Sequence, residues 1–161
     1  MTIEIFSIGV FNSTESEFFD KLTQNKINLF CDIRQRRGVR GSKYAFVNSK
    51  RLQQKLADLH IAYSYIQELA PPPKIRLLQK ESDRENKEIN TKRRNLGEAF
   101  VNEYRSCILK SFNHKEFIEY IEQNGALRIV FFCVEEHPEA CHRSLVTEQF
   151  KNNYNYKITH L

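Results

Sequence analysis

The sequence predicts one α/β domain of three layers, with helices on both faces of a mainly parallel sheet of about five strands. Short apolar runs alternate along the chain with stretches of helical periodicity, which is the pattern of βαβ units. The length of 161 residues matches a single domain, and no internal repeat divides it. We therefore expect one domain over residues 1–161, with a charged excursion at about residues 71–95.

The first half of the chain has the pattern of three strands joined by helices. The expected strands cover residues 2–8, 27–33 and 61–66. Thr14 should cap the first helix, because Glu17 follows three residues later as in a capping box. The second helix should begin at Asn48 or Ser49, both of which are residue types that favour helix starts.

The second half opens with a different composition. Pro71-Pro72-Pro73 is expected to stop regular structure, and residues 79–94 are charged and almost without apolar side chains. This excursion is either a solvated segment or a lid over a site, and the sequence leaves both open. Two helices should follow, one with apolar residues at fourfold spacing from Leu96 and one ending near Gly125. The remaining elements are a strand at 127–132, a helix from about 141 and a strand near 156–160.

Composition limits the class of protein. The balance of 25 basic against 20 acidic residues gives a net charge of +5, which suits a phosphate-bearing or nucleic-acid partner without requiring one. No stretch approaches the ~20 apolar residues of a membrane span, and the N-terminus does not resemble a signal peptide. We therefore expect a cytoplasmic protein with no membrane partner, and we expect its four cysteines to be reduced thiols.

The segment from Cys133 to Arg143 places a thiol, an imidazole and a guanidinium where a strand gives way to a helix. Cys141 is expected near the N-terminus of that helix, where the dipole and neighbouring positive charge stabilise a thiolate. His142 can shuttle a proton, and Arg143 can bind a phosphate or carboxylate through two hydrogen bonds. Two structural alternatives stay open, namely Cys141 as a packed core residue and Arg143 paired with an acid such as Glu135.

The same segment also invites comparison with a zinc site. Cys133, His137, Cys141 and His142 are four soft or borderline ligands within ten residues. Zinc sites, however, usually use ligands paired at CxxC or HxxxH spacing, which this segment lacks. Adjacent residues of a helix also diverge by about 100°, so Cys141 and His142 should not converge on one ion. We therefore predict no metal site and no cofactor.

A second cluster follows the second expected strand, where Asp32 begins a loop that carries Arg34, Arg36 and Arg40. Its glycines allow the backbone to approach an anion closely, although the loop can equally be an exposed basic segment. Asp32 could act as a general base, bind a metal or pair with Arg34 to fix the loop, and we expect the last. Because the carboxyl ends of parallel strands share one edge, this loop should meet the segment 133–143 in one crevice.

These residues resemble the family known as domain of unknown function 488. Its Cys-x-Glu-x-x-Pro-x-x-Cys-His-Arg motif is complete from Cys133 to Arg143, and its Asp-Val-Arg motif appears as Asp32-Ile33-Arg34. The chain departs from the family at Val10, where a histidine often follows the first-strand glycine, and at Arg37, where a proline is usual. The resemblance runs through nearly the whole chain and implies a fold and a site, but no activity. The basic loop indicates a subfamily with a more anionic ligand.

Two functions are compatible with these observations. The first is a small cytoplasmic enzyme that acts on a phosphate-bearing substrate, either a nucleotide or a nucleic acid. Its binding residues are expected to be Arg34, Arg36, Arg40, Arg143 and Glu135, and its catalytic residues Cys141, His142 and Asp32. The alternative is a non-catalytic nucleic-acid-binding module built on the same basic loop.

Overall fold

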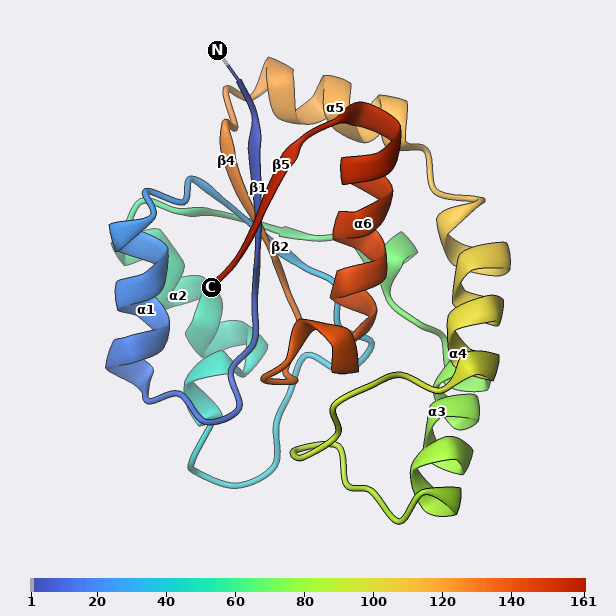
Figure 1. Ribbon diagram of the computed structural model, residues 1–161. Coiled ribbons are helices and arrows are strands. Elements are labelled where there is room, and N and C mark those ends of the chain that lie inside the picture. The colour runs from blue at the N-terminus through green and yellow to red at the C-terminus, as the bar shows by residue number, and fades with distance from the viewer. Residues whose placement is uncertain (1) are drawn as a thin grey trace.

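The computed structural model describes residues 2–161, and over this range the chain forms a five-stranded sheet in the order β3-β2-β4-β1-β5 (Figure 1). The strands are β1 (Glu4–Ile8), β2 (Leu29–Asp32), β3 (Ala62–Tyr65), β4 (Arg128–Phe132) and β5 (Lys157–His160). Every neighbouring pair is parallel. The predicted mainly parallel sheet of about five strands is therefore confirmed.

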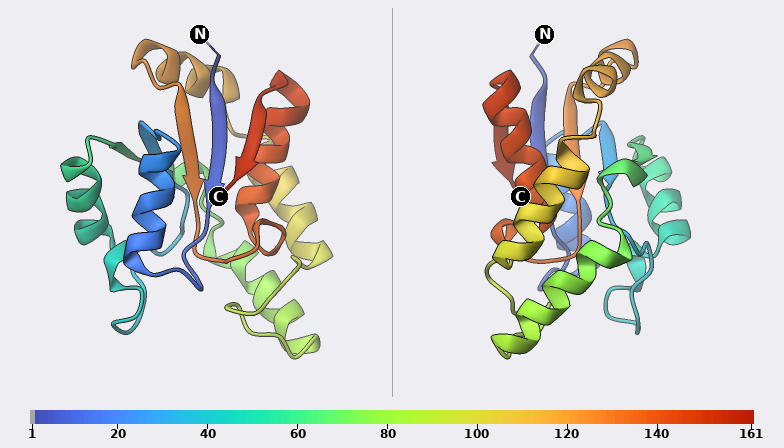
Figure 2. Two further views of the ribbon diagram at one scale, coloured as in Figure 1. Left: turned by 60° about the vertical axis from the view of Figure 1, so that its left-hand side comes forward. Right: turned by 90° about the vertical axis from the view of Figure 1, so that its right-hand side faces the viewer.

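Helices cover both faces of this sheet. They are α1 (Glu15–Gln24), α2 (Ser49–Asp58), α3 (Pro73–Glu85), α4 (Glu98–Glu103), α5 (His114–Gln123) and α6 (His142–Tyr154). The helices α1 and α2 lie on one face, and α3 to α6 lie on the other, so the three predicted layers are present (Figure 2). No helix within residues 2–161 has the length and apolar character needed to cross a membrane.

Each face of the sheet packs on its own apolar core, because successive residues of a strand point to opposite faces. Phe30 of β2 belongs to the core beneath α1 and α2, as do Val130 and Phe132 of β4. Leu29 and Cys31 of β2 belong to the core beneath the other helices. Since both faces are covered, the central strands are mostly apolar, and this is why they stand out in the sequence.

The sequence signal for a helix start is confirmed in full at α1 and only in part at α2. The Thr14 hydroxyl accepts a hydrogen bond from the Glu17 N–H at 3.2 Å, and the Glu17 carboxylate accepts one from the Thr14 N–H at 2.7 Å, which confirms the capping box of α1. Asn48 immediately precedes α2 as predicted, but its side chain does not cap the helix. Its Oδ1 instead accepts a hydrogen bond from the Val39 N–H at 2.6 Å, and so it holds the basic loop that follows β2.

Pro71 and Pro72 interrupt regular structure as predicted, but the prediction was wrong for Pro73, where α3 begins. Proline suits the first position of a helix, since its φ is already helical and an N–H at that position would have no partner within the helix. The charged excursion continues as α3 to Glu85 and then as the mostly irregular segment 86–97. This segment is not uniformly solvated, because Arg93 is only 7% exposed.

The chain leaves two neighbouring strands, β2 and β4, toward opposite faces of the sheet. After β2 it runs to α2, and after β4 it runs to α6 on the other face. Connections that diverge in this way leave a crevice at the carboxyl ends of the strands, where α/β sheets bind ligands. The loops 33–48 and 133–141 and the segment 86–97 all lie at this edge (Figure 1).

Candidate functional site

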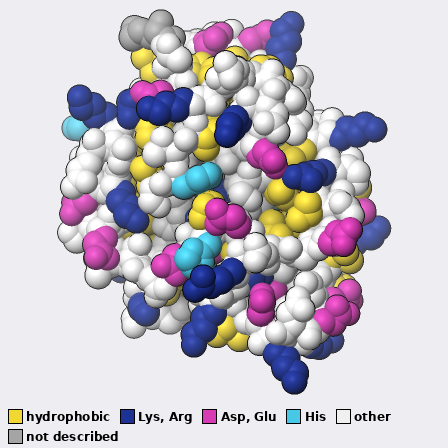
Figure 3. All heavy atoms as spheres, in the orientation of Figure 1, with side chains coloured by type: hydrophobic (Ala, Val, Ile, Leu, Met, Phe, Trp, Pro, Cys, Tyr) yellow, Lys and Arg dark blue, Asp and Glu magenta, His cyan; other side chains and the backbone are white. Residues whose placement is uncertain are grey.

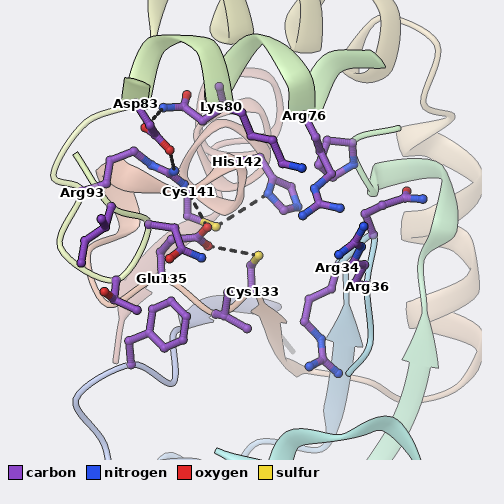
Figure 4. A pocket seen from close by; sticks show the side chains of 18 of the residues that line it. Arg34, Arg36, Arg76, Lys80, Asp83, Arg93, Cys133, Glu135, Cys141 and His142 are labelled. Atoms are coloured by element: carbon purple, nitrogen blue, oxygen red, sulfur yellow. Dashed lines mark hydrogen bonds and ion pairs between the residues drawn. The ribbon is translucent and has the colours of Figure 1, made fainter. Parts of the chain in front are cut away.

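A cleft of about 870 Å³ opens at this edge of the sheet. Its walls come from the loop after β2, from α3 with the segment 86–97, and from the loop after β4 (Figure 4). The structure thus brings Cys141, His142 and Glu135 into one cleft with the predicted arginines of the basic loop. Several basic side chains that make no ion pair within residues 2–161 line it, namely Arg36, Arg40, Lys43, Arg76, Lys80 and Arg84.

Cys141 and His142 form a close pair at the start of α6. Cys141 is the residue before the helix, and its φ of −138° and ψ of 145° are those of extended chain. Its Sγ lies 3.7 Å from Nδ1 of His142. The other ring nitrogen, Nε2, lies 2.8 Å from the carbonyl oxygen of Ile33. Because a carbonyl can only accept, Nε2 carries a proton, and this bond ties the imidazole to the end of β2.

The electrostatics of this pair favour a thiolate and an imidazolium. Burial opposes a charge on Cys141, but the hydrogen bond from Cys133 and the positive charges of His142 and Arg143 outweigh it, so the pKa of the Cys141 thiol lies well below 9.0. Burial also opposes a charge on His142, yet the Cys141 thiolate and Glu135 raise the pKa of its imidazole above 6.5. The two shifts have one cause, because opposite charges stabilise each other strongly in a buried site.

Cys133 and Glu135 lie beside this pair. The Sγ of Cys133 lies 3.3 Å from Oε2 of Glu135, and its single proton serves either that oxygen or the Cys141 sulfur. The interaction with Cys141, together with burial, raises the pKa of the Cys133 thiol well above 9.0. Burial raises the pKa of Glu135 to about 7, although its Oε1 pairs with Arg93 at 2.9 Å. Glu135 is therefore placed to take up or release a proton near neutral pH.

Arg93 connects two walls of the cleft. It pairs with Asp83 of α3 at 2.7 Å as well as with Glu135, and it donates to the carbonyl oxygen of Ala140 at 3.0 and 3.1 Å. Its guanidinium is nearly buried and all three partners are acceptors, so the arrangement is well satisfied. This one side chain fixes the segment 86–97 against the loop after β4.

Asp32 and Arg34 form a buried ion pair with two parallel hydrogen bonds, at 2.9 Å from Nε and 2.8 Å from Nη2. The Tyr63 hydroxyl donates a further hydrogen bond to Asp32 at 2.9 Å, and the Arg34 guanidinium stacks over the ring of Phe132. The expectation that Asp32 pairs with Arg34 is confirmed. Arg34 lines the cleft and Asp32 lies behind it, where its contacts hold Arg34 in place.

Arg143 does not line the cleft, which argues against the anion-binding role predicted for it. It is 1% exposed, and its guanidinium donates to the backbone carbonyls of Glu135 and Glu136 and to the hydroxyl of Ser7. The alternative pairing with Glu135 therefore exists, but through a peptide carbonyl and not through the carboxylate. Gly9 packs against the same carbonyl, because a Cβ at that position would lie 2.0 Å from the Glu135 oxygen. Arg143 therefore fixes the backbone of the loop after β4 from the side that faces away from the cleft.

Three potential metal ligands converge, contrary to the expectation drawn from helix geometry. The sulfurs of Cys133 and Cys141 and one ring nitrogen of His142 lie within 4.8 Å of one another. The expectation failed because Cys141 is extended and precedes α6, so the divergence of adjacent helical residues does not apply. The bond from His142 to Ile33 also leaves Nδ1 directed toward the sulfurs. These residues could hold a soft divalent cation such as zinc.

Arg76, Lys80 and Arg93 were missed by the sequence interpretation, because they lie in the charged excursion. A signal existed for the first two, since residues four apart share a face of a helix, and Arg76 and Lys80 of α3 point toward the cleft (Figure 4). Burial and the neighbouring charge of Arg36 lower the pKa of Arg76, so these two guanidinium groups repel each other. No local feature distinguishes Arg93 from the other basic residues of its segment.

Comparison with known proteins identifies the family of this chain. The family described as domain of unknown function DUF488 matches residues 14–150, which include both loops of the cleft and α3. No curated protein matches the chain, and no solved structure does so. Because the match covers most of the sequence, the chain belongs to the domain of unknown function DUF488 family.

Proposed function

We propose that the protein is an enzyme that acts on a phosphate-bearing small molecule, with the Cys141–His142 pair as its reacting group. The observation that carries this proposal is that basic side chains without an ion-pair partner among residues 2–161 share one cleft with the Cys141 sulfur and the His142 imidazole, which lie 3.7 Å apart. The basic side chains indicate the charge of the substrate, and the Cys141–His142 pair indicates the reaction.

The charge of the substrate is inferred from Arg36, Arg76 and Lys80. None of them forms an ion pair within the described part of the chain, and Arg36 and Arg76 repel each other. Bringing like charges together costs free energy, and an anion between them recovers it. A guanidinium also matches the geometry of phosphate oxygens through two hydrogen bonds. A phosphate is therefore the ligand that this wall favours.

The reaction is inferred from Cys141 and His142. A thiolate is a strong nucleophile, and it is formed here without a separate base because the imidazolium stabilises it. In the proposed reaction the Cys141 thiolate attacks an electrophilic centre of the substrate, and His142 gives its proton to the leaving group. The high pKa of Glu135 suits it to receive a proton in a later step.

The size and lining of the cleft favour a nucleotide over a duplex. Its volume of about 870 Å³ lies within the range of small-molecule sites. Phe11 and Tyr44 line it with rings 5.3 Å apart, and a base can pack against such a surface. Acidic side chains are interspersed with Lys and Arg over the face seen in Figure 3, which shows no continuous basic surface. A reducing compartment such as the cytoplasm suits the free thiols.

Protection of Cys141 from alkylation tests the proposal. The rate at which iodoacetamide modifies Cys141 is measured by mass spectrometry with and without inorganic phosphate, nucleoside monophosphates and nucleoside triphosphates. We expect a phosphate compound to slow the reaction, and we expect Arg36→Ala or Arg76→Ala to abolish the protection. Arg105→Ala is the matched control, because Arg105 pairs with Glu148 and does not line the cleft.

Two results contradict the proposal. One is that no phosphate compound protects Cys141 at any concentration that leaves the fold intact. The other is salt-dependent binding of an oligonucleotide that is equally strong in Cys141→Ser and leaves Cys141 unprotected, which would favour the non-catalytic nucleic-acid-binding module.

A further inference from the structure

We propose that Cys133 and Cys141 form a redox pair, in which a hydroperoxide oxidises Cys141 and Cys133 then closes a reversible disulfide that removes the reactive thiolate. The assignment of the two thiols rests on their geometry alone. Its regulatory consequence, inactivation of the site, rests on the proposed function.

The two sulfurs are already close although they belong to different elements. Cys133 directly follows β4 and Cys141 directly precedes α6, and their Sγ atoms lie within 4.8 Å of each other. Both cysteines are free thiols and line the cleft, where Cys133 is 6% and Cys141 is 1% exposed, so the oxidant has to be small. A disulfide needs a sulfur–sulfur distance of about 2.05 Å, so closure requires a movement of less than about 3 Å.

The movement falls on Cys141, which joins a short helical turn, Pro138–Ala140, to α6. Its N–H donates to the carbonyl of Pro138, and its own carbonyl accepts hydrogen bonds from the N–H and the hydroxyl of Ser144. Cys133 is held more rigidly, because its N–H donates to the carbonyl of Ile8 and Arg143 fixes the carbonyls of residues 135 and 136 in the same loop. Closure therefore displaces the Cys141 side and leaves the sheet unchanged.

His142 and Glu135 are placed to transfer the protons that the oxidation requires. The Cys141 sulfur attacks the terminal oxygen of the hydroperoxide, the O–O bond breaks, and the departing alkoxide takes the proton that Cys141 shares with Nδ1 of His142. Cys141 is then a sulfenic acid, oxidised by two electrons, while the hydroperoxide is reduced to an alcohol.

The disulfide then forms between the Cys133 sulfur and the oxidised Cys141 sulfur. Cys133 gives its proton to Glu135, its nearest carboxylate at 3.3 Å, and attacks the sulfenic sulfur. The S–O bond breaks, and the departing hydroxide takes the proton back from Glu135 as water. The net reaction converts two thiols and one hydroperoxide into one disulfide, one alcohol and one water. Attack of an external dithiol on the disulfide restores both thiols.

The other two cysteines lack these features and serve as internal controls. Cys31 is fully buried in β2, and burial raises its pKa far above that of a free thiol. Cys107 is exposed and donates to Glu103, but it does not line the cleft. Neither belongs to the group of converging ligand atoms formed by Cys133, Cys141 and His142. Oxidation should therefore be confined to the pair in the cleft.

The test treats the full chain with hydrogen peroxide and maps its cysteines by mass spectrometry without reduction. We expect the wild type to lose two hydrogens and to contain one cross-link, between Cys133 and Cys141. Its alkylation at Cys141 should be lost completely and should return with dithiothreitol. Cys133→Ser should accumulate a sulfenic acid at Cys141 that dimedone traps, and Cys141→Ser should give neither product. Cys107→Ser is the matched control and should behave as the wild type.

Three results would overturn the redox pair: sulfinic acid at Cys141 of the wild type without a cross-link, a cross-link that involves Cys31 or Cys107, or stoichiometric zinc that shields both thiols from peroxide. The proposed function is judged separately in Cys133→Ser without peroxide. In this variant a serine hydroxyl can donate to Cys141 in place of the Cys133 thiol, so phosphate compounds should still protect Cys141 from alkylation. Cys133→Ser is expected to form no disulfide, while phosphate compounds still protect its Cys141 from alkylation. If phosphate compounds fail to protect Cys141 in the wild type, that result contradicts the proposed function alone.

Discussion

The Sγ of Cys141 lies 3.7 Å from Nδ1 of His142, although the two residues are adjacent in sequence and only the second is helical. This relationship depends on the extended backbone of Cys141, which turns its side chain back over the imidazole. Because His142 is also held by Ile33 at the end of β2, the pair bridges the two strands whose loops form the cleft. The reactivity of the site thus depends on a contact between the start of α6 and the end of β2.

Replacing His142 with Asn should make Cys141 a weaker nucleophile at neutral pH. The substitution removes the positive charge that stabilises the thiolate, so the pKa of Cys141 should rise by about 1 to 3 units. The measurement is the pH dependence of iodoacetamide alkylation at Cys141, whose midpoint should move to higher pH. His137→Asn, on the exposed part of the same loop, should leave the midpoint unchanged. An unchanged midpoint in His142→Asn would show that the imidazole does not stabilise the thiolate.

Replacing Asp32 with Asn should destabilise the fold strongly. The substitution leaves the buried guanidinium of Arg34 without its counter-ion, which typically costs about 3 to 5 kcal/mol of unfolding free energy. The measurement is urea unfolding. The double variant Asp32→Leu with Arg34→Met removes both charges and should be more stable than Asp32→Asn. Arg51→Ala breaks the exposed pair with Glu15 and should cost no more than about 1 kcal/mol. Equal stability of Asp32→Asn and the wild type would contradict the positioning role.

Replacing Arg143 with Lys should lower stability while leaving the charge unchanged. An ammonium cannot reach the carbonyls of Glu135 and Glu136 and the hydroxyl of Ser7 in the same fork geometry, so we expect a loss of about 1 to 3 kcal/mol. Urea unfolding measures this loss. Arg36→Ala should show the opposite pattern, with unchanged stability and lost protection by phosphate. A stable Arg143→Lys that loses phosphate protection would restore Arg143 to the binding residues.

His114 should make the fold less stable in mild acid. Burial lowers its pKa below 6.5, so the unfolded chain takes up a proton at a higher pH than the folded one. The stabilisation from neutral His114 is therefore complete above about pH 6.5 and is lost as the pH falls through the folded-state pKa. His114→Phe keeps a ring against Phe150 and cannot bind a proton, so its unfolding free energy should fall less between about pH 7 and pH 5. Parallel pH profiles for the two proteins would contradict this assignment.

Much of the fold could be predicted because strands covered on both faces must be mostly apolar. Residues 127–132 stood out for this reason, and Thr14 with Glu17 marked the start of α1. The strand order could not be predicted in the same way. β4 inserts between β1 and β2, and nothing local in its sequence specifies which strands it pairs with. That choice is made by packing between distant segments.

The site was located from the sequence, but the roles of its arginines were not. Arg34 closely follows the end of β2 and Arg143 lies in the first turn of α6, and Arg34 lines the cleft whereas Arg143 donates to peptide carbonyls behind it. The direction of such side chains depends on where the loop ends and the helix begins, which residue type alone does not determine. The same reason applies to Cys141, whose extended conformation placed three potential ligands together. Arg93 differs from the other basic residues of its segment only in its contacts with distant residues such as Glu135, which the sequence does not show.

The few anchors of the segment 86–97 have a consequence for motion. This segment contributes a wall of the cleft but no strand or long helix, and it is attached to the loop after β4 by the Arg93 guanidinium and by a hydrogen bond from the Leu96 N–H to the carbonyl of Glu139. Such a segment can detach by local unfolding, at a free energy far below that of the whole domain. Its amide hydrogens should then exchange with solvent much faster than those of β4, even though both border the same cleft. A substrate larger than the closed volume can therefore enter without disturbing the sheet.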